Sequence, residues 1–326
     1  MVVLAIGVTP DTALAKEAGL ELGIKGSIVV NDRMETSVPD IYAAGDAVQV
    51  KHYVTGDDAL ISLAGPANKQ GRIIADNICG GDSHYLGSQG SSVIKVFDMT
   101  AATTGINETN AKKSGLEVDT VILSPMSHAG YYPGGKVMTM KVVFEKETYR
   151  LLGAQIIGYE GVDKRIDVLA TAIHAGLKAT QLKDLDLAYA PPYSSAKDPV
   201  NMAGFMIDNI AKGTLKQWHL EDMDKISKDK NVVLLDVRTV GEFNRGHMKG
   251  FNNIPVDELR ERISEIEKGK PVYLICQSGL RSYIASRILE GNGYETYNFS
   301  GGFRFYDTVV NDRALIEMAY ACGMDY

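Results

Sequence analysis

The chain has few of the residues from which covalent cross-links and metal centres are built. It contains three cysteines, Cys79, Cys276 and Cys322, an odd number at wide spacings. Such spacing argues against a disulfide framework, and no C-x-x-C pair suggests zinc. Cys79 stands at the end of a helical pattern and is predicted to be a packed helix cysteine, and Cys322 is assigned no role. The six histidines are scattered without an H-E-x-x-H pattern. We therefore expect neither a disulfide scaffold nor a bound metal.

Long apolar runs and an excess of basic charge are also missing. No stretch approaches the roughly 18 apolar residues that a membrane span requires. The apolar opening at residues 2–8 lacks the basic flank of a signal peptide. The 34 basic and 41 acidic side chains give a net charge of -7, which argues against nucleic-acid and anionic-membrane partners. These observations predict a cytoplasmic protein.

What is present fits a globular chain of several domains. Its 326 residues are 45% hydrophobic and 23% charged, which suggests two or three domains. The chain opens on the apolar run VVLAIG without a polar cap, so we expect it to begin inside a fold, as an N-terminally truncated protein would. A Gly/Ser-rich stretch near residues 80–92 marks a boundary, and residues 211–225 read as a linker.

Residue patterns predict a mixture of α/β and α+β folds. The middle of the chain combines strands with helices, as in an α+β domain on an antiparallel sheet, while the last third alternates short apolar strands with helices, as in an α/β domain with a parallel sheet. The expected helices are a short one within residues 9–22 and longer ones at residues 57–79, 107–115, 161–177, 197–212, 256–267 and 282–290. The expected strands cover residues 2–7, two segments within 26–48, and 92–98, 100–106, 136–145, 151–158, 232–236, 271–276 and 295–300.

The segment PVYLIC-QSGLRS is the most informative in the sequence. An apolar strand ends at Cys276, and a short loop leads through Ser278 and Gly279 to Arg281 and Ser282 at the start of a helix. A thiol at the end of a parallel strand faces the edge where α/β sheets build their sites. Backbone N–H groups of the loop favour a thiolate, and an arginine at its rim adds positive charge. We predict a nucleophile that carries a persulfide; a buried structural cysteine is the alternative.

This loop resembles that of the rhodanese family, and the likeness extends over roughly residues 220–322. The family's entrance segment and closing glycines have counterparts in Asp236, Arg238, Glu242, Gly246, His247, Pro255, Gly301 and Gly302. The resemblance implies a sulfurtransferase with a donor such as thiosulfate or polysulfide, in which Asp236, Arg238 and His247 are structural. Cysteine phosphatases place the arginine six positions after the cysteine, but Arg281 follows Cys276 by five, so we expect little phosphatase activity.

A second resemblance begins at TSVPDIYAAGDAV, which is similar to the second FAD-binding motif of pyridine-nucleotide disulfide oxidoreductases. It implies that Asp46 accepts a hydrogen bond from the ribityl chain of FAD, and that Gly45 gives the backbone room. The next segment, LAGPANKQGRIIADNI, resembles the helix beside the flavin ring. Its small residues Ala64 and Ala67 suit close approach to a planar group, although they suit tight helix packing equally.

Residues 92–212 resemble the dimerisation domain of the same family, in the form known from coenzyme A-disulfide reductases fused to a rhodanese. HAGYYPGG and LAYAPPYSSAKDP carry this likeness. It implies a homodimer in which Tyr131 and Tyr189 reach the partner's active site, with Tyr132 and Tyr193 as competing choices. Interface aromatics are an equally good reading of these tyrosines. The resemblance also implies NAD(P)H as reductant and coenzyme A as the small thiol acceptor.

These likenesses divide the chain into four predicted units: residues 1–29, the tail of an NAD-binding domain; 30–88, the C-terminal part of an FAD-binding domain; 92–212, the dimerisation domain; and 220–326, the rhodanese domain. Three functional hypotheses follow. The chain is a sulfurtransferase acting through Cys276, or part of a complete NAD(P)H- and FAD-dependent CoA-disulfide or persulfide reductase, or a non-catalytic dimerising remnant.

The 326 residues lack both G-x-G-x-x-G fingerprints of the flavoprotein family and its redox cysteine near the flavin. Because these glycines let the backbone approach the pyrophosphate, a purified protein of this sequence is expected to hold little or no FAD. The absorbance spectrum after gel filtration with added FAD measures this. A stoichiometric flavin spectrum would refute the expectation.

Overall fold

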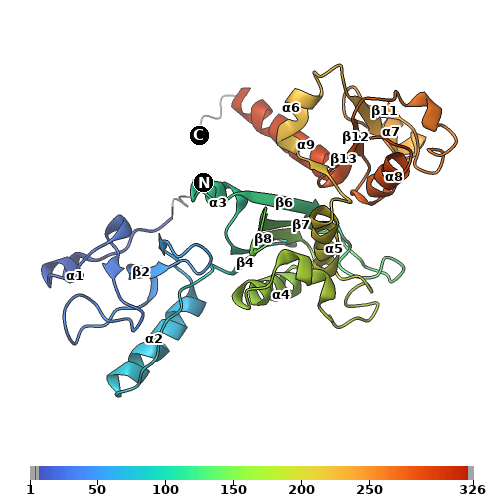
Figure 1. The fold of residues 1–326 in the computed structure, drawn as a ribbon. Helices are drawn as coiled ribbons and strands as arrows, with labels where there is room; N and C mark the ends of the chain where they lie inside the picture. The colour runs from blue at the N-terminus through green and yellow to red at the C-terminus, as the bar shows by residue number, and fades with distance from the viewer. Residues whose placement is uncertain (1–3, 5–6, 322–326) are drawn as a thin grey trace.

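The computed structural model describes residue 4 and residues 7–321, and the backbone alone for residues 312–321. Its described residues form three sheets, one of three strands and two of five. Figure 1 shows them along the chain as a small N-terminal unit, a central unit and a C-terminal unit. The predicted mixture of α/β and α+β folds, with a parallel sheet toward the C-terminus, is confirmed.

The N-terminal unit is a small sheet with one long helix. Strand β1 (Ile28–Val29) runs parallel to β2 (Val48–Lys51), which pairs antiparallel with β3 (Asp58–Ala59). Met34, Val48 and Val50 form its buried core. The remaining elements are listed by their bounds: α1 (Ala13–Glu17), η1 (Ile24–Gly26), η2 (Gly45–Ala47) and α2 (Ala64–Ile78).

The central unit is an antiparallel sheet in the order β4-β5-β8-β7-β6. Helix α4 packs on β5 and β8, and α5 packs on β6. Apolar side chains of β6, β7 and β8 lie in the largest buried cluster, together with residues of α4 and α5. The elements are β4 (Ser92–Val96), β5 (Met99–Gly105), α3 (Glu108–Lys113), β6 (Val118–Leu123), β7 (Thr139–Glu145), β8 (Leu151–Gly158), α4 (Val162–His174), η3 (Ala179–Asp184) and α5 (Pro199–Ala211).

The C-terminal unit is a parallel sheet in the order β11-β10-β12-β13-β9, with helices around it. Its central strands are nearly continuous runs of buried apolar residues, which is what a parallel sheet covered on both faces requires. The elements are β9 (Gln217–Trp218), η4 (Leu220–Asp222), α6 (Met223–Ile226), β10 (Val233–Asp236), α7 (Val240–Arg245), β11 (Asn252–Asn253), η5 (Ile263–Glu265), β12 (Val272–Ile275), α8 (Leu280–Glu290), β13 (Thr296–Phe299) and α9 (Gly302–Ala321).

The central and C-terminal units are joined along strand β6. Asp119 contacts the His219 ring at 3.2 Å, and the Gln217 side-chain amide donates to the carbonyl of Thr120 at 3.3 Å. The Ile122 N–H donates to the Ser300 hydroxyl at 3.1 Å in a buried position. Because these bonds tie β6 to β9 and to the end of β13, the two units are linked by structured contacts as well as by the chain.

Several predicted elements are wrong. The helix expected over 57–79 begins only at Ala64, because residues 58–59 pair with β2. The segment IYAAGD is no strand: Tyr42 makes a single bridge and Gly45–Ala47 is a 3-10 turn. Residues 256–267 contain only turns and a short 3-10 helix. Helix α7 and strand β6 were not predicted. The strand expected at 2–7 lies mostly outside the described residues.

A buried ion pair fastens α4 to α5. Arg165 and Asp198 meet at 2.9 Å with 1% and 4% of their side chains exposed, and the Asp198 carboxylate also caps α5 by accepting from the Val200 N–H. Removing one partner leaves a charge buried without compensation, which costs on the order of 3–5 kcal/mol.

Asp198→Ala is therefore expected to lower the free energy of unfolding by about that amount, ~3–5 kcal/mol, as measured by urea denaturation. The matched control is Asp58→Ala, since Asp58 pairs with Lys51 on the surface and exposed pairs contribute ~0–1 kcal/mol. Equal losses in the two variants would contradict the structural role given to the buried pair.

Candidate functional site: the Cys276 loop and two further sites

Cys276 directly follows strand β12 and precedes the loop that enters helix α8. The β-strand places it at the carboxyl edge of the parallel sheet, where neighbouring strand ends and helix N-termini meet. The residue is 1% exposed, and its backbone carbonyl accepts from Phe303 N–H at 2.7 Å. The thiol therefore sits in a fixed, nearly enclosed position at the base of the loop.

Two hydrogen-bond donors face the sulfur. The Gly279 N–H lies 3.1 Å from Cys276 Sγ, and the Ser282 hydroxyl lies 3.2 Å from it. Gly279 is the N-cap of α8 with φ 99°, a left-handed conformation that favours glycine. Donors at a helix N-terminus stabilise a sulfur anion. The sequence led us to expect a ring of amides, whereas among the described residues one amide and one hydroxyl donate to Sγ.

The sequence predicted that Arg281 adds a free positive charge at the rim of the loop, but the structure pairs this charge. Both its terminal nitrogens donate to Glu242 of α7, each at 2.7 Å. This bidentate pair lowers the pKa of the Glu242 carboxyl to about 2, and the hydrogen bonds that Arg281 donates to Glu242 raise the pKa of Arg281. A fork-to-carboxylate pair fixes both side chains, so Arg281 ties the loop to α7 while its charge is largely compensated.

The residues expected to be structural surround this loop. Asp236 and Arg238 form a buried pair at 2.7 Å, and the Arg238 guanidinium lies 3.8 Å from the Phe303 ring centre. His247 follows α7, is exposed, and stacks on Phe243 with 3.9 Å between the ring centroids. None of the contacts among the described residues joins its ring to Cys276, and its structural role stays a prediction.

The glycine pair that closes the unit packs against the same loop. A Cβ at Gly302 would lie 2.7 Å from the backbone of Ser278, so only glycine fits there. Ser278 itself is exposed at the loop's surface. Asn298, in strand β13, donates from its side-chain nitrogen to the Gly279 carbonyl at 3.1 Å. The sequence reading missed Asn298; an asparagine in the middle of the apolar run TYNF was the available signal.

The residues that resemble a flavin motif lie together in the N-terminal unit. Gly45, with φ 84°, approaches Ala67 of α2: a Cβ added there would lie 3.9 Å from the Ala67 methyl group. The Gly45 N–H is held by the Gln70 side chain at 2.7 Å. Asp46 and Ala64 are exposed on this side. A solvent-facing carboxylate beside small residues fits one wall of a flavin site; their role there stays a prediction.

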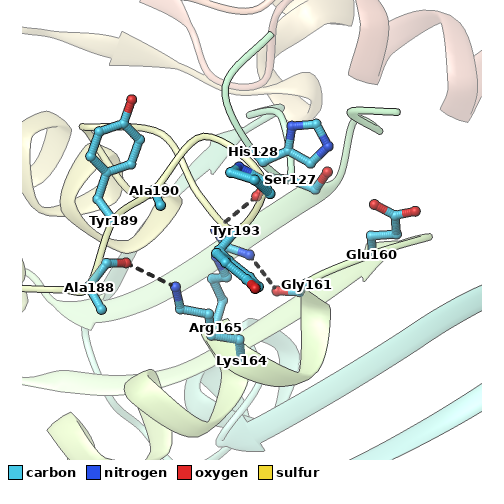
Figure 2. Close-up of a pocket in the computed structure, with 11 residues that line it drawn as sticks. Ser127, His128, Glu160, Gly161, Lys164, Arg165, Ala188, Tyr189, Ala190 and Tyr193 are labelled. Atoms are coloured by element: carbon cyan, nitrogen blue, oxygen red, sulfur yellow. Dashed lines mark hydrogen bonds between the residues drawn. The ribbon is translucent and has the colours of Figure 1, made fainter. Parts of the chain in front are cut away.

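The central unit contains a pocket with a volume of about 490 Å³. The residues that line it are Ser127, His128, Glu160, Gly161, Lys164, Arg165, Ala188, Tyr189, Ala190, Pro192 and Tyr193. Figure 2 shows Lys164 donating to the carbonyl of Ala188. The Tyr131 and Tyr189 hydroxyls meet at 2.8 Å, and this bond raises the pKa of Tyr189. Of the competing tyrosines, Tyr193 lines the pocket and Tyr132 packs on His128.

Cys79 corrects another expectation. The sequence predicted a cysteine packed against its helix, but Cys79 is the exposed C-cap of α2. The preceding Ile78 is 64% exposed, so few described residues cover this helix end. Cys322 lies outside the described residues.

Comparisons with protein families match three stretches of the chain. Residues 1–71 match "pyridine nucleotide-disulphide oxidoreductase", residues 91–199 match its dimerisation domain, and residues 219–307 match a rhodanese-like domain. These matches agree with the two resemblances found in the sequence. No helix of the described residues is long and apolar enough to cross a membrane.

Individual relatives and solved structures match different shares of the chain. The chain is 40% identical to the CoA-dependent NAD(P)H sulfur oxidoreductase of Pyrococcus abyssi over 61% of this chain and 45% of that protein. It is 37% identical to the coenzyme A disulfide reductase of Staphylococcus aureus over 63% of this chain and 47% of that protein. The solved structure of reduced Bacillus anthracis CoADR-RHD superposes with a TM-score of 0.93 at 49% identity, covering 96% of this chain and 56% of that chain. The chain thus spans about half the length of the relatives it matches.

The Glu242–Arg281 pair generates a pH prediction. The folded pKa of Glu242 is about 2, below its ordinary 4.5, so the pair stabilises the fold above pH 4.5 and loses this contribution as pH falls toward 2. Thermal melts should show wild type more stable than Glu242→Gln at pH 6, with the difference shrinking steadily between pH 4.5 and pH 2.

The control for this series is Glu267→Gln, because Glu267 pairs with Lys270 on the exposed surface of the same unit. Its difference from wild type should be small at every pH. A Glu242→Gln difference that stays constant down to pH 2 would show that the carboxylate charge is not the stabilising feature.

Proposed function

We propose that this chain, in which pyridine nucleotide-disulphide oxidoreductase domains precede a C-terminal rhodanese-like domain, is a sulfurtransferase that forms a persulfide on Cys276. The observation that carries the proposal is the placement of two donors, Gly279 N–H at 3.1 Å and the Ser282 hydroxyl at 3.2 Å, on the sulfur of Cys276. These contacts stabilise the sulfur as an anion, both as nucleophile and as leaving group.

The reaction divides into two balanced steps. With thiosulfate as donor, the Cys276 thiolate attacks the outer sulfur, a new S–S bond forms, the bond to the sulfonate breaks, and sulfite leaves with the electron pair. In the second step a thiolate acceptor attacks the outer persulfide sulfur, and the electron pair of the breaking S–S bond returns to Cys276 Sγ. The protein's own groups act at that atom: Gly279 and Ser282 donate to the charge that returns there.

Ser278 and Arg281 complete the proposed site in different ways. Ser278 is exposed where the loop meets solvent, next to the path of an incoming donor. Arg281 is a positioning residue for the loop, because both terminal nitrogens of its guanidinium donate to the Glu242 carboxylate. Thiosulfate and polysulfide are both suitable donors, since each carries an electrophilic outer sulfur on a good leaving group.

A second function concerns the longer proteins to which this chain is similar. We propose that, within a polypeptide of their length, the chain serves a homodimeric NAD(P)H- and FAD-dependent reductase of CoA disulfide or CoA persulfide. The Tyr131–Tyr189 hydroxyl pair and the solvent-facing Asp46 favour it. Asp46, Gly45, Ala64 and Ala67 would hold one side of FAD, which supplies hydride acceptance when bound. The tyrosines would donate hydrogen bonds to a thiolate of the coenzyme A substrate in the partner subunit.

Cys276→Ser is expected to reduce thiocyanate formation from thiosulfate and cyanide to the rate without protein, because the serine hydroxyl forms no persulfide. The colorimetric thiocyanate assay measures this rate. Cys79→Ser is the matched control: Cys79 is the exposed cap of α2, so its loss should leave the rate unchanged. Full activity in Cys276→Ser would overturn the proposed function.

A further inference from the structure

The carbonyl oxygen of Gly279, in the loop that follows Cys276, faces three hydrogen-bond donors. The Tyr283 N–H of α8 lies 3.0 Å from this oxygen, the Ser282 hydroxyl 3.1 Å and the Asn298 side-chain nitrogen 3.1 Å. A carbonyl oxygen has two lone pairs. The backbone N–H of Tyr283 and the amide of Asn298 occupy both, so the Ser282 hydroxyl is one donor more than this oxygen needs.

The Ser282 hydroxyl has one hydrogen and two acceptors within reach. Its oxygen is fully buried and lies 3.2 Å from Cys276 Sγ and 3.1 Å from the Gly279 carbonyl oxygen. Because a serine hydroxyl carries a single hydrogen, it donates to one of these acceptors at a time. The acceptor that lacks another donor attracts it more strongly. Since the Gly279 carbonyl is already supplied by Asn298, the hydrogen is left for the sulfur.

Asn298 fills this place at a cost to the fold. It lies in β13, between β12 and β9, and is 3% exposed. Its Oδ1 is buried and has no hydrogen-bond partner among the described residues, which is unfavourable for a polar atom away from water. If the amide were rotated by half a turn, this oxygen would face the Gly279 carbonyl oxygen. An apolar side chain of the same size would avoid the cost, so the asparagine serves the loop more than the core.

We propose that Asn298 is a positioning residue for sulfur transfer: by occupying the Gly279 carbonyl, it leaves the single hydrogen of Ser282 for the sulfur of Cys276. The inference rests on the proposed sulfurtransferase function and adds to it a residue outside the loop. The Ser282 hydroxyl donates to Sγ while Sγ is a thiolate, and again when the electron pair returns there in the second step. No proton leaves the serine oxygen in either step; only the direction of the O–H bond changes.

The charged groups around the loop are already paired. Arg281 of α8 is bound to Glu242 of α7, and Arg238 is bound to Asp236 at the end of β10, each pair with a contact of 2.7 Å. These four side chains are retained in every variant described below. A change in the pH dependence of the reaction therefore reports a change in the neutral donors that face the sulfur, since the nearby charges stay the same.

The test measures kcat/KM for thiosulfate against pH in the full chain, with cyanide as acceptor, because kcat/KM reports the titration of the free enzyme. Asn298→Leu should move the midpoint of the rising limb up by about half a pH unit, and Ser282→Ala by about one unit. In the double variant the midpoint should equal that of Ser282→Ala, because Asn298 acts through the serine hydrogen.

Unfolding by urea separates this role from a structural one. Asn298→Leu should unfold at a urea concentration no lower than wild type, because the Gly279 carbonyl keeps the Tyr283 N–H and the Ser282 hydroxyl and the unpartnered oxygen is removed. Asn298→Ala removes the same donor without adding volume. Its pH midpoint should shift as far as that of Asn298→Leu, although the cavity it leaves lowers its stability.

Tyr294→Phe is the matched control. The Tyr294 hydroxyl also holds backbone carbonyls of the same unit, those of Ile263 at 3.2 Å and Ile266 at 3.0 Å. Its loss should lower the urea midpoint and leave the pH midpoint of wild type. A wild-type pH midpoint in both Asn298 variants, or shifts that add in the double variant, would overturn the role given to Asn298. Absence of wild-type thiocyanate formation would instead overturn the sulfurtransferase function itself.

Discussion

The short hydrogen bond from Gly279 N–H to Cys276 Sγ is the contact on which the rest of the candidate site depends. It requires the left-handed conformation of Gly279, which caps α8 and turns the loop back over the sulfur. It also requires that the Gly279 carbonyl be held from behind, which the Asn298 side-chain amide does. Because Ser282 also donates to Sγ, the same few groups set the loop's shape and the sulfur's charge.

The loop is held by charge pairs as well as by the helix cap. Arg281 is bound to Glu242 of α7, and the Asp236–Arg238 pair supports the strand end on the other side. Because Glu242 compensates its charge, Arg281 makes the loop rigid more than it attracts an anionic sulfur donor. The donors that face the sulfur are then neutral dipoles, which suits a persulfide of small charge better than a doubly charged phosphate.

The arrangement of units gives this loop a neighbour that an isolated sulfur-transfer domain would lack. Strand β6 binds β9 and Ser300, which brings α5 opposite the Cys276 loop. The pocket at this contact is lined by residues of both units, among them Lys197 of the central unit and Asn298 of the C-terminal unit.

The amino-acid sequence by itself determined the local chemistry: the cysteine after an apolar strand, the glycine in its loop, and the parallel sheet that follows from short, continuous apolar strands. These features depend on residues that are adjacent in the sequence, so their conformational preferences can be inferred from the sequence alone. Only the tertiary structure decided that Arg281 is bound by Glu242, 39 positions away, that Asn298 supports Gly279 from another strand, and that Cys79 is exposed. Partners distant in sequence are chosen by packing, and no local pattern records which side chains packing brings together.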